Sequence, residues 1–328
     1  MPKRRDLIVG VDLGGTSMRA LVVDPSYQIL GEDKRRTKVK DKPRKLMEEI
    51  ADVVEEAMDK ADVKWSAIRA VSIGAPGAVD PVQGIVRHAP NLGWKDVPLG
   101  EKLKKMLGGV PVLVENDVNV GTAGEHALGA AQGSHDVVGI FVGTGIGGGI
   151  ILGDQLYDGS RGAAGELGHM VLLAGGPKCG CGKHGCAEAL ASRTAMERDV
   201  RAAIKEGKKS VVLDIMKERD YARMTSRVIL VALRRKDAVM RQVMERAEYY
   251  LGLLVANVVN LLDPECVVIG GGIAERLQEG FVKPIRETAY EYFLQQRDAR
   301  RIRILPGLLG DNAGALGAAV LARRRLES

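Results

Sequence analysis

Two segments of the chain carry the same local pattern, in which an apolar stretch, a glycine-rich turn and a second apolar stretch follow one another. The first is LIVGVDLGGTSMRALVVD, residues 7–24, and the second is VVGIFVGTGIGGGIIL, residues 137–152. Apolar β-formers on both sides of a glycine turn predict a β-hairpin. Because the pattern occurs twice, the sequence predicts an internally duplicated fold.

The second hairpin contains Gly143-x-Gly145-x-x-Gly148, the letter pattern of a dinucleotide-binding loop. Such a loop must open a helix, whose N-terminal amides then hold the pyrophosphate. Here Ile150–Leu152 and a Gly-Asp pair follow, which predicts a second strand and a turn instead. We therefore interpret both segments as hairpin tips whose backbone N–H groups can approach phosphate oxygens. A tight hairpin without any ligand stays open as the alternative.

The remainder of the chain alternates strands and helices, which is typical of an α/β protein. Residues 42–61 have helical periodicity, residues 68–80 and 110–119 read as buried strands, and the chain after the cysteine loop is mostly helical to about residue 262. A chain of 328 residues is longer than a single hydrophobic core usually accommodates, so two domains with a cleft between them are expected. The predicted domains are a smaller one of residues 1–116 plus about 313–328 and a larger one of residues 117–312.

The charge and hydropathy of the chain exclude several classes of protein. The net charge of +6 comes from short clusters such as DKRRTKVK at 33–40, but acidic residues are interspersed and aromatic residues make up only 4%. Solvated surfaces that attract anionic substrates are therefore favoured over a nucleic-acid interface. No apolar run is long enough to span a bilayer, and the start of the chain does not resemble a signal peptide. We expect a cytoplasmic protein that binds neither nucleic acid nor membrane.

Three cysteines lie within the eight residues CGCGKHGC, at Cys179, Cys181 and Cys186. Disulfides in so tight a loop would be strained and do not suit a cytosolic chain. Thiolates in a glycine-rich loop can instead converge on one tetrahedral zinc ion, with a fourth ligand from elsewhere. The residues alone leave His169 and His184 open as that ligand. The fourth cysteine, Cys266, is expected in the core.

The segment VLVENDVN ends a buried strand in polar residues, Glu115, Asn116 and Asp117. A hydroxyl that attacks a γ-phosphate needs a carboxylate within reach to accept its proton, and Asp117 is suited to that role. Asn116 and Asp117 could equally cap the helix that follows. The residues alone do not decide between the two roles.

Seven motifs of the chain resemble, in their order, those of the ROK family (repressors, open reading frames and kinases), its bacterial glucokinases in particular. They are VGVDLGGT, GAPGAVD, VENDVN, GTGIGGG, GELGH, CGCGKHGCAE and GGGI. The resemblance covers nearly the whole chain. It implies two duplicated domains of the actin-like ATPase (ribonuclease H-like) superfamily, with structural Zn²⁺ and with Mg²⁺ accompanying ATP. It also implies His169 as the fourth zinc ligand and Asp117 as the general base.

The resemblance further assigns two sets of binding residues. The implied sugar contacts are Gly77 in the APG turn, Asn91, Asn116, Asp117, Glu166, His169 and Glu188. The implied nucleotide contacts are Asp12, Gly14, Gly15, Thr16, Gly143, Thr144, Gly145, Gly271 and Gly272. A bulky residue at Gly145 is expected to weaken ATP binding more than sugar binding.

The expected activity is ATP-dependent phosphorylation of a hexose, with glucose as the first choice and glucose 6-phosphate as the product. Mannose, fructose, allose, N-acetylglucosamine and N-acetylmannosamine are alternative substrates that the motifs do not exclude, and polyphosphate is an alternative donor. A non-catalytic sugar-sensing regulator is the second alternative. Only six residues precede the first strand, so a DNA-binding helix-turn-helix is not expected there. A homo-oligomer, dimer or tetramer, is expected.

Overall fold

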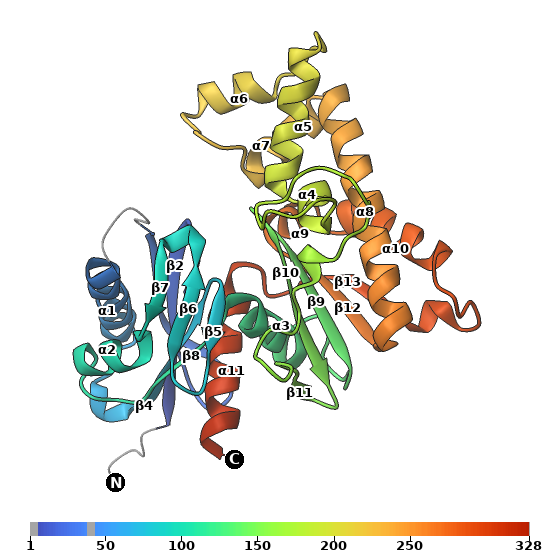
Figure 1. The fold of residues 1–328 in the computed structure, drawn as a ribbon. Coiled ribbons are helices and arrows are strands. Elements are labelled where there is room, and N and C mark those ends of the chain that lie inside the picture. Colours follow the sequence, from blue (N-terminus) through green and yellow to red (C-terminus); the bar gives the residue numbers. More distant parts are fainter. Residues whose placement is uncertain (1–5, 38–42, 328) are drawn as a thin grey trace. The chain divides into compact units, whose positions relative to one another are not determined.

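The computed structural model describes residues 6–37 and 43–327 (Figure 1). Tertiary contacts divide the chain into two compact units. Unit 1 comprises residues 1–133, 149–164 and 311–328, and unit 2 comprises residues 134–148 and 165–310. The helix that starts at Asp117 belongs to unit 1, whereas the predicted boundary at residue 116 assigns it to the second domain. The helix falls in unit 1 because it packs against the C-terminal helix of the chain.

A five-stranded sheet forms the centre of unit 1, in the order β3-β2-β1-β4-β8. Its strands are β1 (Leu7–Leu13), β2 (Ser17–Val23), β3 (Ile29–Arg36), β4 (Ile68–Ala75) and β8 (Val112–Asn116). Strands β1, β2 and β3 form an antiparallel meander, and β4 and β8 continue the sheet in parallel with β1. The first predicted hairpin is thereby confirmed as β1 and β2.

Helices cover this sheet because each has an apolar face or small residues at the contact. They are α1 (Pro43–Lys60), α2 (Leu99–Met106), α3 (Asp117–Leu128) and α11 (Ala313–Glu327). Leu46, Ile50 and Val53 of α1 are fully or almost fully buried, as its helical periodicity predicts. Helices α3 and α11 approach closely at Gly317, where an added Cβ would lie 1.6 Å from the carbonyl oxygen of Val120.

A separate three-stranded sheet contains β5 (Ala78–Asp80), β6 (Ile85–Ala89) and β7 (Trp94–Val97). The short 3₁₀ helix η2 (Pro90–Leu92) connects β6 to β7, and η1 (Trp65–Ala67) precedes β4. The short strands β5, β6 and β7 carry too little periodicity to be recognised separately in the sequence.

The second large sheet has the order β11-β10-β9-β12-β13. Its strands are β9 (Val137–Val142), β10 (Ile146–Leu152), β11 (Gln155–Leu156), β12 (Cys266–Gly270) and β13 (Arg303–Pro306). Numbered by first appearance within each sheet, both sheets have the strand order 3-2-1-4-5, and in both the last two strands run parallel to the first. This shared topology confirms the duplication that the two glycine hairpins predict.

Strand β10 continues into a tight turn and β11, as the Gly-Asp pair predicts. Gly153 and Asp154 both have positive φ angles, 55° and 66°, which suit a two-residue hairpin turn. A strand therefore follows the glycine-rich segment, and the dinucleotide interpretation of Gly143-x-Gly145-x-x-Gly148 is excluded.

The other elements of the chain are helical. They are η3 (Leu167–His169), α4 (Ala187–Ala191), α5 (Arg193–Lys205), α6 (Val212–Glu218), α7 (Ser226–Arg234), α8 (Ala238–Leu262), α9 (Gly272–Leu277), α10 (Glu279–Glu291), η4 (Ala299–Arg301) and η5 (Gly310–Asn312). Helices α4, α5 and α10 pack on α8, the longest of these helices, whose apolar residues enter a large core with β9 and β12. In the described part of the chain, no helix has both the length and the apolar character that crossing a membrane requires.

Candidate functional site

In unit 1, the glycine turn after β1 carries the first group of predicted nucleotide contacts. The N–H of Gly14 donates to the carbonyl of Ser17 at 3.0 Å, which closes the turn around Gly15 and Thr16. Thr37 donates to two carbonyls of this turn, through its side chain to Gly14 (2.7 Å) and through its backbone to Thr16 (3.0 Å). The carbonyls of Gly14 and Thr16 are thus engaged by the protein.

Asp12 lies just before this turn, and two further carboxylates face it. Burial, and then repulsion by Asp117 and Asp311, raise the pKa of Asp12 to about 7. Carboxylates crowded in this way fit a hard divalent cation, since Mg²⁺ prefers oxygen ligands and would offset the repulsion. Asp311 was not recognised from the sequence, because it is about 300 residues from Asp12 and no local motif marks it.

The junction of β8 and α3 brings together three of the predicted sugar-site residues. The side chain of Asn116 caps α3 by accepting from the N–H groups of Val118 (2.9 Å) and Asn119 (3.1 Å). Its amide nitrogen donates to the carbonyl of Gly77 at 3.0 Å. Asn116 therefore does perform the capping role that the sequence left open, and Asp117 follows as the first residue of the helix.

Asp117 also contributes to the helix start, because its Oδ1 accepts from the N–H of Val118 at 3.0 Å. The predicted sugar residue Asn91 lies in η2, exposed, with its Cβ 4.0 Å from the Cβ position of Gly15. Asn91 thus lies beside the glycine turn of unit 1.

Glu115 stabilises the junction of β8 and α3 through hydrogen bonds and an ion pair, a role that was not predicted from the sequence. Its carboxylate is almost fully buried and accepts from the N–H of Asn116 (2.9 Å) and the amide of Asn119 (3.1 Å). Its second oxygen forms an ion pair with Arg325 of α11. The position of Asp117 is therefore fixed by a contact between residues 210 positions apart.

In unit 2, the turn between β9 and β10 is held by the start of α5. The backbone N–H of Arg193 donates to the carbonyl of Gly143 (3.0 Å), and the hydroxyl of Thr194 donates to that of Thr144 (2.8 Å). On the other side, Glu188 accepts from the N–H of Ile146 at 3.1 Å. A Cβ on Gly145 would lie 2.3 Å from the same carboxylate oxygen, so the glycine leaves room for Glu188.

The second predicted nucleotide turn of unit 2 follows β12 and lies next to the first. Gly271 has a φ of +90°, and a Cβ there would lie 2.4 Å from the carbonyl oxygen of Val142, the last residue of β9. Gly272 opens α9 beside the hydroxyl of Ser226. Because β9 and β12 are parallel, both turns lie at the carboxyl ends of their strands, where ligands of open α/β sheets bind.

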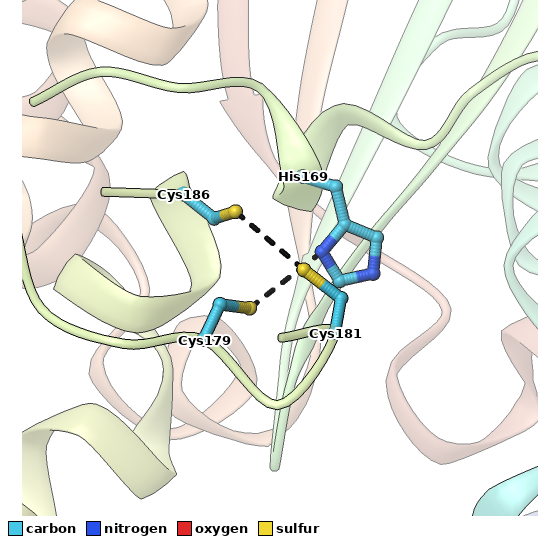
Figure 2. Close-up of side chains that lie close together, drawn as sticks. All are labelled: His169, Cys179, Cys181 and Cys186. Atoms are coloured by element: carbon cyan, nitrogen blue, oxygen red, sulfur yellow. Dashed lines mark hydrogen bonds between the residues drawn. The ribbon is translucent and has the colours of Figure 1, made fainter. Parts of the chain in front are cut away.

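The cysteine loop and η3 bring four potential metal ligands together (Figure 2). One ligand atom each from His169, Cys179, Cys181 and Cys186 lies within 4.8 Å of all the others. The separation of the Cys181 and Cys186 sulfurs is 3.8 Å, as is that of the Cys179 sulfur and His169 Nδ1. A tetrahedral zinc ion with bonds of about 2.3 Å separates its sulfur ligands by about 3.8 Å. The donor set and its spacing therefore fit zinc.

The two histidines that the sequence could not separate differ in this respect. His184 lies outside the cluster, with its Nδ1 3.0 Å from the carbonyl oxygen of Gly176. His169 directs Nδ1 toward the sulfurs, while its Nε2 lies 3.9 Å from the carboxylate of Glu166. Glu188 is next to the same cluster, with its Oε1 3.5 Å from the Cys179 sulfur. Glu166 and Glu188, two of the predicted sugar residues, therefore lie beside the cluster, and His169 belongs to it. Cys266 is fully buried in β12, as expected.

The two sheets of identical strand order, each with a glycine hairpin, define the class of two-domain proteins with the actin-like ATPase fold. Within this class, the chain belongs to the ROK family, whose family model matches residues 8–325.

Two curated relatives and one solved structure show how far this similarity extends. The glucokinase of Halalkalibacterium halodurans is 34% identical over 98% of this chain and 96% of its own length, and that of Thermotoga maritima is 35% identical over 99% of both. The crystal structure of a ROK family glucokinase from Streptomyces griseus, in complex with glucose and AMPPNP, matches 97% of this chain and 99% of its own. Its TM-score is 0.84 and its sequence identity 35%.

Proposed function

We propose that this protein is an ATP-dependent hexose kinase that converts glucose to glucose 6-phosphate. The observation that carries the proposal is the match, over 97% of the chain, to a kinase structure that contains glucose and an ATP analogue. The glucokinase relatives match nearly their whole length as well.

Asp117 is the general base of the proposed reaction. It stands where β8 ends and α3 begins. Glu115 holds the N–H of Asn116 on its N-terminal side, and the side chain of Asn116 holds the N–H of Val118 on its C-terminal side. The 6-hydroxyl of the sugar gives its proton to this carboxylate as the oxygen attacks the γ-phosphorus. Most of the remaining catalysis is positioning and charge neutralisation, which the backbone N–H groups of the two glycine turns supply.

Asp12 is the proposed carboxylate beside the metal that accompanies ATP. Mg²⁺, when bound, supplies positive charge to the phosphates. Asp12 provides an oxygen near the glycine turn. Burial and repulsion by Asp117 and Asp311 raise its pKa although Arg19 and Lys34 act in the opposite direction, so a divalent cation would be favoured beside it.

The hexose hydroxyls are proposed to meet carboxylate, amide and imidazole groups, which can accept and donate in pairs. The residues proposed for these contacts are those that the family resemblance implies: Gly77, Asn91, Asn116, Asp117, Glu166, His169 and Glu188. In support, Gly77 and Asn116 are hydrogen-bonded to each other, and Glu166 and Glu188 lie beside the cluster to which His169 belongs.

We further propose that the cluster of His169, Cys179, Cys181 and Cys186 holds a structural zinc ion. The four donors form a closed set typical of structural rather than catalytic zinc. Zinc on Nδ1 of His169 would fix the tautomer of the ring and leave Nε2 for a hydroxyl or for Glu166. Zinc is thereby proposed to stabilise the structure of the sugar site, whereas proton transfer is assigned to Asp117.

A homo-oligomer, dimer or tetramer, is proposed as the working form. Large side chains, including Tyr249, Tyr292 and Leu294, are exposed near the contact of α8 with the end of α10, where Asn260 fixes the chain by two hydrogen bonds. Light scattering on the purified chain measures the state directly.

A panel of hexoses tests the proposed activity. ADP release is measured with MgATP and each of glucose, mannose, fructose, allose, N-acetylglucosamine and N-acetylmannosamine, with polyphosphate as a second donor. The highest kcat/KM is expected for glucose with ATP. Turnover of another hexose and not of glucose would show that glucose is not the substrate. Sugar binding without turnover of any hexose would indicate a sugar-sensing regulator instead of a kinase.

A further inference from the structure

The β9–β10 turn of unit 2 presents hydrogen-bond donors and no free carbonyl. The carbonyl of Gly143 accepts from the N–H of Arg193, that of Thr144 from the hydroxyl of Thr194, and that of Gly145 from the N–H of Gly143. Across residues 6–37 and 43–327, the N–H groups of Thr144 and Gly145 have no protein acceptor. A turn with all acceptors engaged and two donors left over is suited to an anion.

The Arg193 side chain extends this donor set. Its guanidinium donates to Oγ1 of Thr144 at 2.7 Å. A threonine hydroxyl has one proton to donate, and here its oxygen is already engaged as an acceptor. The proton is therefore available to a third group, on the side of the hydroxyl that does not face Arg193.

The charge of Arg193 is not neutralised by the protein. The guanidinium is half-buried, and both burial and the neighbouring Arg223 lower its pKa. Glu197, the carboxylate that acts against this effect, is engaged by Arg201, Arg223 and the N–H of Met224. Among the residues that the structure describes, no carboxylate lies within 4 Å of the Arg193 guanidinium. An arginine stays protonated in proteins, so the positive charge of Arg193 is available to bind an anion.

We propose that Arg193 is a positioning residue of the nucleotide site, which orients the Thr144 hydroxyl as a donor to a phosphate oxygen of the nucleoside triphosphate and adds positive charge beside it. This inference rests on the proposed function, since it assumes that the Gly143–Gly145 turn meets the phosphates. Nothing in the sequence motif around Thr144 indicates an arginine 49 residues later.

Calorimetric titration with MgAMPPNP tests the proposal without requiring turnover. The variants are Arg193→Gln, Arg193→Lys, Thr144→Val and the double variant Arg193→Gln/Thr144→Val. Arg198→Gln is the matched control, because Arg198 is a half-buried arginine of the same helix that pairs with Asp199. Titration with glucose alone on each variant reports whether the sugar site is intact.

The expected result is that Arg193→Gln weakens MgAMPPNP binding about tenfold, the size of effect of one charge-assisted hydrogen bond. Arg193→Lys should recover part of the loss, because the charge remains while the fixed geometry is lost. The double variant should lose little more than Arg193→Gln alone, since both residues act through one hydroxyl. Glucose affinity and the Arg198→Gln control should stay within about twofold of the wild type.

Equal MgAMPPNP affinity in the wild type and in both folded Arg193 variants would overturn the inference and leave the kinase proposal standing. Additive losses in the double variant would overturn the role through Thr144. A wild type that binds no MgAMPPNP would refute the kinase proposal itself, and the inference with it.

Discussion

Among single residues, Gly145 belongs to the predicted phosphate turn and also lies against the carboxylate of Glu188, a contact that the sequence did not indicate. It lies in the predicted phosphate turn, and the carboxylate of Glu188 occupies the space that a side chain would fill. The predicted sugar site and the predicted nucleotide turn of unit 2 therefore share this glycine. A substitution here should disturb both sites.

We predict that Gly145→Val raises KM for glucose as well as KM for ATP, each by about tenfold or more, because the new side chain displaces Glu188. This revises the expectation from sequence that ATP binding is affected more. Gly280→Ala is the control, since a Cβ at Gly280 meets no atom within 4 Å and this glycine lies in α10, outside both proposed sites. Steady-state kinetics with each substrate varied in turn measures both constants, and an unchanged KM for glucose in Gly145→Val would contradict the shared role.

Glu248 in α8 is a second residue for which the structure, and not the sequence, indicates the property that matters, namely its pKa. It is buried, and burial followed by repulsion from Glu245 raises its pKa to about 8. The folded protein therefore binds this proton up to about pH 8, while the unfolded chain loses it near the ordinary glutamate value of about 4.5. Between these values the folded state binds more protons, so the free energy of unfolding must fall as pH rises.

We predict that Glu248→Gln removes this part of the pH dependence. The variant should gain at least about 1 kcal/mol over the wild type between pH 5 and pH 8, because glutamine carries no charge to bury. Urea unfolding at the two pH values measures it. Glu245→Gln, at an exposed position of the same helix, should change the slope much less. A parallel pH dependence in the wild type and Glu248→Gln would show that Glu248 is not buried as a neutral group.

At the scale of elements, the cysteine loop owes its shape to glycines and to the proposed metal. Gly182 and Gly185 have φ angles of +89° and +75°, and a Cβ on Gly185 would lie 1.7 Å from the carbonyl oxygen of Leu173. Burial raises the pKa of the Cys179 thiol to about 12 when no cation is present. A bound zinc ion would reverse this by stabilising the thiolate.

We predict that Cys181→Ala lowers the zinc content from one ion per chain to none and lowers Tm by several degrees, because metal binding is coupled to local folding. KM for glucose should rise, since Glu166 and Glu188 contact the cluster. His184→Ala, in the same loop but outside the cluster, should keep its zinc. Elemental analysis combined with thermal unfolding measures both quantities. Zinc retained in Cys181→Ala, or an unchanged Tm after verified zinc loss, would contradict the proposed role.

At the scale of the whole molecule, the sequence predicts the repeated parts of the fold well. Strand and turn residues are local signals, so the two hairpins, the helix α1 and the closely spaced cysteines are recognisable from short windows. The choice of His169 rested on the family resemblance, and the geometry now brings this histidine to the three sulfurs.

Contacts between distant residues could not be predicted in the same way. Glu115 pairs with Arg325, Arg193 reaches Thr144, and Asp311 faces Asp12, yet no periodicity or spacing connects the members of each pair. Such pairs form only when the strand order brings separate segments together. These long-range contacts, which position the residues of the proposed site, are therefore not predictable from local sequence patterns.

The base assignment of Asp117 is tested most directly by the turnover of Asp117→Asn with glucose and MgATP. Asparagine retains an oxygen that can accept from the N–H of Val118, so the start of α3 is preserved while the basic carboxylate is lost. We predict that kcat falls by at least about a hundredfold, with Tm and the affinities for glucose and MgAMPPNP close to those of the wild type. An Asp117→Asn enzyme that kept most of its kcat would contradict the assignment of Asp117 as the base.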